Sequence, residues 1–173
     1  ARLTFNYMRV GGVKWDAPEG WVDGVREFVP YLREQLKGYH SLVSGNEIFL
    51  DRVKGVGVYS KEDAINYSLS GPNLRSTGVK WDLRKDEPYS IYDRFDFDVV
   101  TRDEGDCLAR YHVRLEEIEE SLKILEQACE QFPAEGEIMA KVPKIIKAPK
   151  GEAFVRIESP RGEIGCYISS DGK

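Results

Sequence analysis

Five arginines lie in short stretches of irregular composition, and three acidic residues lie beside them. The arginines are Arg9, Arg75, Arg84, Arg110 and Arg161, and the acids are Asp82, Asp106 and Glu158. Arginine suits buried or interfacial ion pairs, because its planar guanidinium binds a carboxylate through two parallel hydrogen bonds. Two interpretations follow: the pairs lock irregular backbone onto a helical bundle, or some of them tune a nearby redox centre.

Other kinds of active site find little support in the sequence. The two histidines, His40 and His112, lie in segments with a helical pattern, and neither has a partner at the spacing of a helical metal site. No Gly-x-Ser-x-Gly turn is present for a serine nucleophile. Gly55-Val-Gly57 lacks the other residues of a phosphate-binding loop. We therefore expect no catalytic residue and no metal ligand in this chain.

Two further groups of charged residues allow a functional or a plain interpretation. Asp96 and Asp98 alternate with Phe95 and Phe97, so they would share one strand face and either perform acid–base chemistry or simply face water. Four lysines between residues 141 and 150 would contact lipid head groups or an acidic neighbour, or belong to a solvated linker.

The composition is that of an ordinary globular domain. The 173 residues are 41% hydrophobic and 32% charged, and the net charge of −5 disfavours a nucleic-acid partner. No apolar run approaches the roughly 20 residues that span a bilayer, and no signal peptide is visible. The cysteines, Cys107, Cys129 and Cys166, are odd in number and far apart, which favours a reducing compartment.

Hydrophobic spacing predicts one kinked and one short helix in the first half of the chain. Apolar residues recur at steps of three and four over residues 16–45, with Asp16 as N-cap and Pro30 as the kink. A helical turn is expected near residues 46–52. Ser60 and Asp63 have the spacing of a capping box, which starts a short helix over residues 60–69.

The second half predicts a long helix, a connection and a hairpin. The helix covers residues 106–131, and its apolar stripe is Leu108, Tyr111, Leu115, Ile118, Leu122, Leu125 and Cys129. Residues 134–152 form a solvated connection, and residues 153–170 form a β-hairpin that turns at residues 159–162. Alternating phenylalanine and aspartate predict a strand over residues 94–100.

The expected fold class is therefore α+β and mainly α. We expect one domain fragment over residues 1–173, a partial helical bundle with two or more long helices and a small C-terminal β-hairpin.

Four stretches resemble signatures of one family of respiratory proteins. They are Tyr7-Met-Arg-Val-Gly-Gly-Val13, Ser70 to Lys85, Gly105 to Glu117, and Glu158-Ser-Pro-Arg-Gly-Glu-Ile-Gly165. In order and spacing they resemble the large quinone-site subunit, of the 49-kDa type, of respiratory NADH:quinone oxidoreductase (complex I). The turn at Glu158 to Gly162 is also similar to Glu-Ala-Pro-Arg-Gly of nickel–iron hydrogenase large subunits, to which that family is related.

The resemblance implies a part in electron transfer rather than a complete active site. In that family the subunit stands against a neighbour that carries the terminal iron–sulfur cluster, and the quinone head group binds between them. The family's quinone-contacting histidine and tyrosine would precede Ala1, so we expect an inactive fragment that binds no cofactor itself. In the intact complex, the expected function is electron transfer from that cluster to quinone, coupled to proton translocation by membrane subunits. The expected partners are quinone and the other complex I subunits, and the expected location is peripheral, at the cytoplasmic side of a bacterial membrane.

Two positions near the start of the chain match family residues close to that cluster. Arg9 matches an arginine whose positive charge would favour the reduced cluster and raise its potential. Thr4 stands where some relatives have a histidine proposed to take up a proton, and threonine cannot titrate.

Three alternatives remain open. The chain could belong to the catalytic subunit of a membrane-bound nickel–iron hydrogenase relative, to the corresponding subunit of a dehydrogenase with another electron donor, or to a helical interaction module without a redox role. Because its neighbours would be missing, we expect the fragment to expose an apolar patch or to self-associate.

Overall fold

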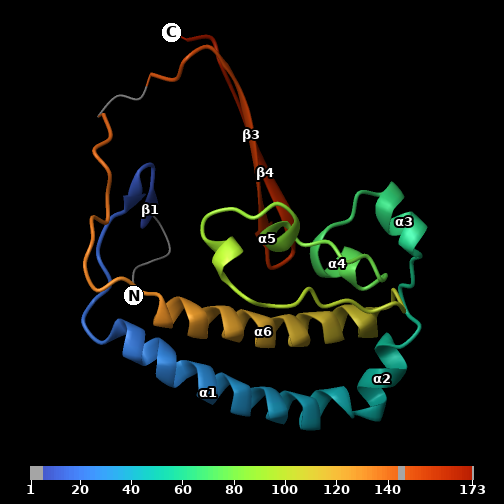
Figure 1. The fold of residues 1–173 in the computed structure, drawn as a ribbon. Coiled ribbons are helices and arrows are strands. Elements are labelled where there is room, and N and C mark those ends of the chain that lie inside the picture. The colour runs from blue at the N-terminus through green and yellow to red at the C-terminus, as the bar shows by residue number, and fades with distance from the viewer. Residues whose placement is uncertain (1–5, 144–146, 173) are drawn as a thin grey trace.

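Two long helices form the centre of the molecule. The computed structural model describes residues 6–143 and 147–172. Helices α1 (Trp21–Tyr39) and α6 (Cys107–Glu130) lie side by side and run in opposite directions (Figure 1). This arrangement, with short helices around the pair and a C-terminal β-hairpin, confirms the mainly helical α+β class.

The apolar stripes of the two helices meet in a common core. Val29 and Leu36 of α1 and Leu122 of α6 are buried there, and the partly buried residues Leu32, Leu115, Ile118 and Leu125 pack against them. Removal of this apolar surface from water, worth about 25 cal/mol per Å², is the main force that joins α1 to α6.

The first helix differs from the expected span of residues 16–45 at its start. It begins at Trp21 after Gly20, whose φ of 75° is left-handed, and Asp16 accepts a hydrogen bond from the Ala17 amide instead of capping the helix. Pro30 lies inside α1 without ending it. The chain then continues as a π-helical turn, η1 (His40–Ser44).

Two short helices follow, and each has a polar N-cap. The Asn46 side chain caps α2 (Glu47–Val53) by accepting from the Phe49 amide at 3.1 Å. Ser60 and Asp63 form a reciprocal capping box at the start of α3 (Lys61–Asn66), which ends before the expected residue 69.

Residues 70–100 cover the face of α6 opposite α1 (Figure 1). They contain the short elements α4 (Gly71–Arg75), α5 (Leu83–Asp86) and η2 (Tyr92–Arg94). The sequence did not predict these elements, because helices of three to five residues carry no full period.

The prediction of a strand over residues 94–100 is wrong. Phe95 and Phe97 are buried and the two aspartates are exposed, so the alternation is real, but no neighbouring strand is present in the described part of the chain. Side chains of α6 take its place: Gln127 accepts from the Asp96 amide at 2.8 Å and donates to the Asp96 carbonyl at 2.7 Å, and Glu120 accepts from the Asp98 amide at 2.8 Å.

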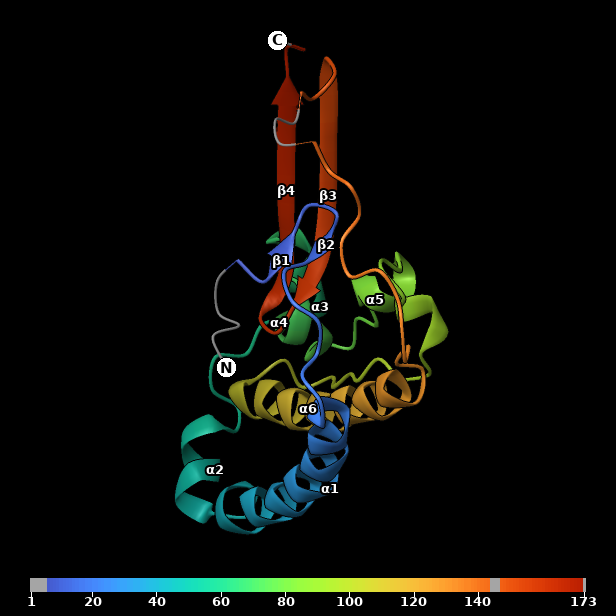
Figure 2. The ribbon, with the colours of Figure 1, turned by 90° about the vertical axis from the view of Figure 1, so that its left-hand side faces the viewer.

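Two separate hairpins complete the fold. A small one pairs β1 (Met8–Arg9) with β2 (Gly12–Val13). A longer one pairs β3 (Gly151–Ser159) with β4 (Gly162–Ser170) and projects away from the helices (Figures 1 and 2). The connection, expected over residues 134–152, therefore ends two residues earlier, because β3 begins at Gly151. Lys144, one of the four lysines of this connection, lies outside the described residues.

No helix in the described ranges is both long and apolar enough to cross a bilayer.

Candidate functional site

A buried arginine at the end of α4 is the hub of the largest group of charges. The Arg75 side chain is only 2% exposed. Its Nε donates to Glu117 Oε1 at 2.7 Å, and its Nη1 donates to Glu158 Oε1 and to the Trp81 carbonyl, both at 2.9 Å. Asp82 Oδ2 lies 3.7 Å from Nη1. Three carboxylates thus surround one guanidinium.

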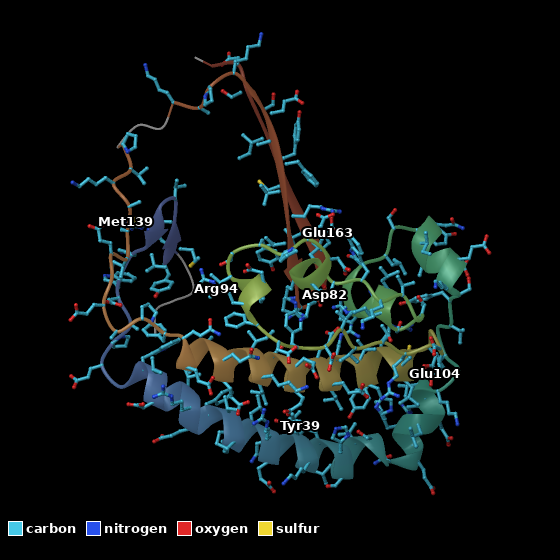
Figure 3. The ribbon with its side chains drawn as sticks, viewed as in Figure 1. Tyr39, Asp82, Arg94, Glu104, Met139 and Glu163 are labelled. Atoms are coloured by element: carbon cyan, nitrogen blue, oxygen red, sulfur yellow. The ribbon has the colours of Figure 1, made fainter. Side chains whose placement is uncertain are left out.

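A second arginine completes this arrangement. Arg84 donates through Nη2 to Asp82 Oδ2 at 2.7 Å and through Nε to Asp82 Oδ1 at 3.0 Å. The Glu158 carboxylate also accepts from the Leu83 amide at 3.4 Å. We call Arg75, Asp82, Arg84, Glu117 and Glu158 the central charge cluster. It joins α4, α5, α6 and β3, and Figure 3 places Asp82 between α6 and the base of the long hairpin.

The cluster shifts two carboxyl groups in opposite directions. Burial alone would raise the pKa of Asp82, but the hydrogen bonds and charge of Arg84, helped by the charge of Arg75, hold that pKa below its usual value. Burial raises the pKa of Glu117 above its usual value, although Arg75 opposes the shift. A cavity of about 390 Å³ adjoins the cluster and is lined in part by Tyr92 and Arg114.

Asp106 and Arg110 act through backbone groups rather than through an ion pair with each other. Asp106 caps α6 by accepting from the Ala109 amide at 2.7 Å, and it also accepts from the Gly55 amide at 2.6 Å. Arg110 donates to the carbonyls of Gly105 at 2.8 Å and Gly57 at 3.0 Å. Both residues therefore fasten the 55–59 loop to the start of α6.

The remaining arginines lie apart from the cluster. Arg9 is exposed on β1, where its Nε donates to Asn6 Oδ1 at 3.2 Å. Arg161 is exposed at the tip between β3 and β4. Within the described residues neither forms an ion pair, so the ion-pair interpretation of Arg161 has no support in the structure. Thr4 lies outside the described residues.

Sequence reasoning missed Glu117. The available signal was its place at the end of the signature that begins at Gly105, on α6 but off the apolar stripe that packs on α1. Asp96 and Asp98 lie on the exposed side of their segment, and the histidines lie elsewhere, with His40 Nδ1 at 3.1 Å from Ser44 Oγ. Among described residues, no group of three or more His, Cys, Asp or Glu could hold a metal ion.

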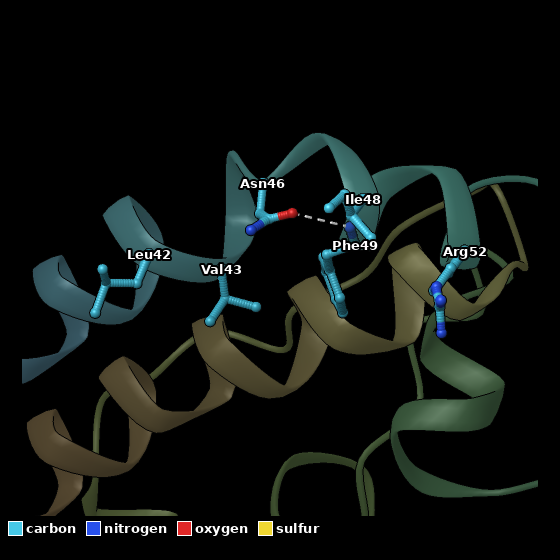
Figure 4. Close-up of a pocket in the computed structure, with 6 residues that line it drawn as sticks. All are labelled: Leu42, Val43, Asn46, Ile48, Phe49 and Arg52. Atoms are coloured by element: carbon cyan, nitrogen blue, oxygen red, sulfur yellow. Dashed lines mark hydrogen bonds between the residues drawn. The ribbon is translucent and has the colours of Figure 1, made fainter.

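Two further hollows lie away from the cluster. An apolar depression of about 300 Å³ lies between η1 and α2 (Figure 4), and its Asn46 is already used as the cap of α2. A larger cleft of about 790 Å³ lies between residues 7–21 and residues 132–138.

Comparison with known proteins identifies the family. The family described as "Respiratory-chain NADH dehydrogenase, 49 Kd subunit" matches residues 1–173. The chain is 80% identical over 173 residues to a NADH-quinone oxidoreductase subunit of Bacillus mycoides (strain KBAB4), and 77% identical to the same subunit of Geobacillus thermodenitrificans (strain NG80-2). Each match covers 100% of this chain and 47% of the relative, so the chain spans about half the length of these curated relatives.

A solved structure shows the same fold in a different respiratory complex. A chain of the membrane-bound sulfane sulfur reductase (MBS), an archaeal respiratory membrane complex, superposes with a TM-score of 0.87 at 40% sequence identity, over 94% of this chain and 45% of that one. The resemblance carried by the four signature stretches is thus confirmed, and the chain belongs to the 49-kDa subunit family of respiratory-chain NADH dehydrogenase.

Proposed function

We propose that this chain is part of a subunit that helps pass electrons from a neighbouring subunit's iron–sulfur cluster to quinone, coupled to proton translocation by membrane subunits. One observation carries the proposal: identity of 77% to 80% across all 173 residues with proteins named as one and the same subunit of NADH-quinone oxidoreductase. The chain would lie at the cytoplasmic side of the membrane as a peripheral component, with the other subunits and quinone as partners.

Arg9 is the residue that we assign to the redox step. It lies exposed on the small hairpin, and among the described residues its side chain has only Asn6 as a polar contact, so its charge is available to a neighbouring subunit. A fixed positive charge beside an iron–sulfur cluster favours the reduced, more negative state and raises the potential. Threonine at position 4 cannot take up a proton, so proton uptake on cluster reduction is either absent with this chain or carried by another group.

The central charge cluster has a supporting role in this proposal. It holds the base of the long hairpin against α6 and the short helices, and its charges are satisfied within the chain. Such a cluster fixes the shape of the subunit surface rather than reacting with quinone.

A second candidate function follows from the structural neighbour. The archaeal sulfane sulfur reductase chain shares the fold at a TM-score of 0.87 and 40% identity. A subunit of this shape therefore also suits a complex that passes electrons to a sulfur compound.

The role of Arg9 is tested by replacing it in the full-length subunit within the intact complex. In Arg9→Met we expect the midpoint potential of the terminal cluster, measured by an EPR redox titration, to fall, with slower NADH-driven quinone reduction. Arg9→Lys should keep the potential near wild type, and Arg52→Met, an exposed arginine on α2, serves as the control. An unchanged potential in Arg9→Met would remove Arg9 from the redox step.

The choice between the two functions is tested by the electron acceptor of the wild-type complex. Reduction of a sulfane sulfur compound but not of quinone would favour the second function.

A further inference from the structure

The cleft of about 790 Å³ has walls from two distant parts of the chain. One wall comes from residues 7–21, which include the connection between the small hairpin and α1, and the other comes from residues 132–138 after α6. Four aromatic side chains line it: Tyr7, Trp15, Trp21 and Phe132. Trp15, Trp21 and Phe132 are each more than 40% exposed, so together they place apolar ring surface in contact with water on the walls of one cleft.

Backbone contacts hold the two walls together. The Val13 amide donates to the Ile138 carbonyl, and the Ala140 amide donates to the Gly11 carbonyl, each at 2.9 Å. The approach is so close that a Cβ on Gly12 would lie 2.1 Å from the Ile138 oxygen. At the other end, the rings of Trp21 and Phe132 meet with centroids 6.0 Å apart. The cleft is therefore formed before any partner binds.

The charged groups of the cleft all have one sign. Asp16, Glu135 and Glu137 line it, and no lysine, arginine or histidine of the described chain does. All three are exposed, and none forms an ion pair within the described residues. Asp16 accepts a local hydrogen bond from the Ala17 amide at 2.7 Å. Aromatic faces surrounded by unpaired carboxylates attract a cation on both counts, through the ring quadrupole and through charge.

One ring of the cleft already has a cation over it. Lys14 Nζ lies over the Trp15 ring at 3.9 Å from its centroid. The three carboxylates would repel anionic lipid head groups and nucleic acid. An uncharged aromatic ligand would leave these carboxylates without a counter-charge. The chemistry of the cleft therefore selects a positively charged occupant with an apolar stem, as lysine and arginine side chains have.

We propose that this cleft seats a lysine- or arginine-bearing segment of a neighbouring subunit, with the methylene stems against Trp15, Trp21 and Phe132 and the cationic heads on Asp16, Glu135 and Glu137. The inference rests on the proposed function only in that the chain works within a complex of several subunits. It assigns the cleft to assembly and not to electron transfer.

The test compares two triple variants of the full-length subunit in reconstitution with a complex lacking it. One variant carries Asp16→Asn, Glu135→Gln and Glu137→Gln. The matched control carries Glu47→Gln, Asp51→Asn and Glu62→Gln, three exposed carboxylates on α2 and α3. We expect the cleft variant to bind about tenfold more weakly at low salt, since three exposed charge pairs together are worth roughly that factor. The difference should shrink as NaCl is raised, because salt screens such pairs.

Each outcome of this comparison bears on the proposal. Weaker binding of the cleft variant alone supports it. Equal affinity of the cleft variant and wild type overturns it, as does equal weakening in both triple variants, which would reflect overall charge. Because association is measured without electron transfer, a complex that assembles normally yet fails to reduce quinone counts against the proposed function and not against the cleft.

Discussion

Arg75 shows how one side chain can decide the local structure of an irregular segment. Its partners Glu117 and Glu158 lie 42 and 83 residues away along the chain, and all three side chains are largely buried. Buried ion pairs contribute little relative to a well-packed apolar replacement, but breaking one leaves an unpaired buried charge. The cluster is therefore more important for the unique position of the hairpin base than for net stability.

The first prediction concerns the loss of this arginine. Arg75→Met should lower the free energy of unfolding by about 3–5 kcal/mol, because Glu117 and Glu158 would lose their buried counter-ion. Urea denaturation followed by circular dichroism measures the change. Lys37→Met, which removes the exposed pair with Glu34, should change it by less than about 1 kcal/mol. Similar small effects in both variants would contradict the importance of burial.

The second prediction concerns pH. The unfolded pKa of an aspartate is about 3.9, and the folded pKa of Asp82 lies below its usual value. The stability from Asp82 is therefore fully present above about pH 4 and is lost as the pH falls through the lower folded pKa. In Asp82→Asn, the free energy of unfolding should depend less on pH in this acid range. Parallel pH profiles of variant and wild type would show that Asp82 is not the group involved.

At the scale of elements, the long hairpin meets α4 through two glycines. Gly71 has a φ of 64°, and a Cβ there would lie 2.4 Å from the Gly162 Cα. Ser70 Oγ accepts from the Glu163 amide at 2.9 Å beside this contact. Backbone thus crosses backbone at a distance that only glycine permits.

The third prediction follows from this crossing. Gly71→Ala should lower the free energy of unfolding by about 2 kcal/mol or more, because it adds both a steric clash and left-handed strain. Gly24→Ala, in the interior of α1, should instead raise it by about 0.5–1 kcal/mol, because outside the backbone of α1 itself no described atom lies within 4 Å of the added Cβ. Thermal or urea unfolding of the two variants checks the opposite signs. A stable Gly71→Ala variant would mean that the crossing is loose.

At the scale of the whole molecule, the long hairpin leaves an apolar face uncovered. The register pairs Ala153 with Ile168, Val155 with Cys166 and Ile157 with Ile164. Alternation puts these six side chains on one face, where Val155 is 61% and Ile168 59% exposed. An isolated two-stranded hairpin with such a face is marginal in water.

The fourth prediction is that this chain self-associates through the apolar face. Sedimentation velocity should show oligomers, and an apolar dye should bind. Val155→Thr with Ile168→Thr keeps the strand propensity and should reduce both signals. Glu152→Thr with Ser169→Thr, a cross-strand pair on the opposite face, is the control and should leave both signals unchanged. A clean monomer with little dye binding would contradict the prediction.

Local features of the sequence predicted much of the helical fold. Steps of three and four placed the α6 helix within one residue at each end, because its apolar stripe repeats over many turns. The Ser60–Asp63 capping box was visible because both partners lie within one helical turn. The four signature stretches were enough to indicate the family, since each is a local run of residue types.

Tertiary structure alone decided which charges meet and which segment is a strand. The alternation at residues 95–98 was correct, but α6 side chains, not a strand, satisfy the backbone of that segment. Packing also decided that Glu117 meets Arg75, and that Asp16 shares a cleft with Glu135 and Glu137, more than a hundred residues further along the chain. Periodicity and capping act within a few residues and are written locally, whereas contacts between distant residues depend on how the completed helices pack.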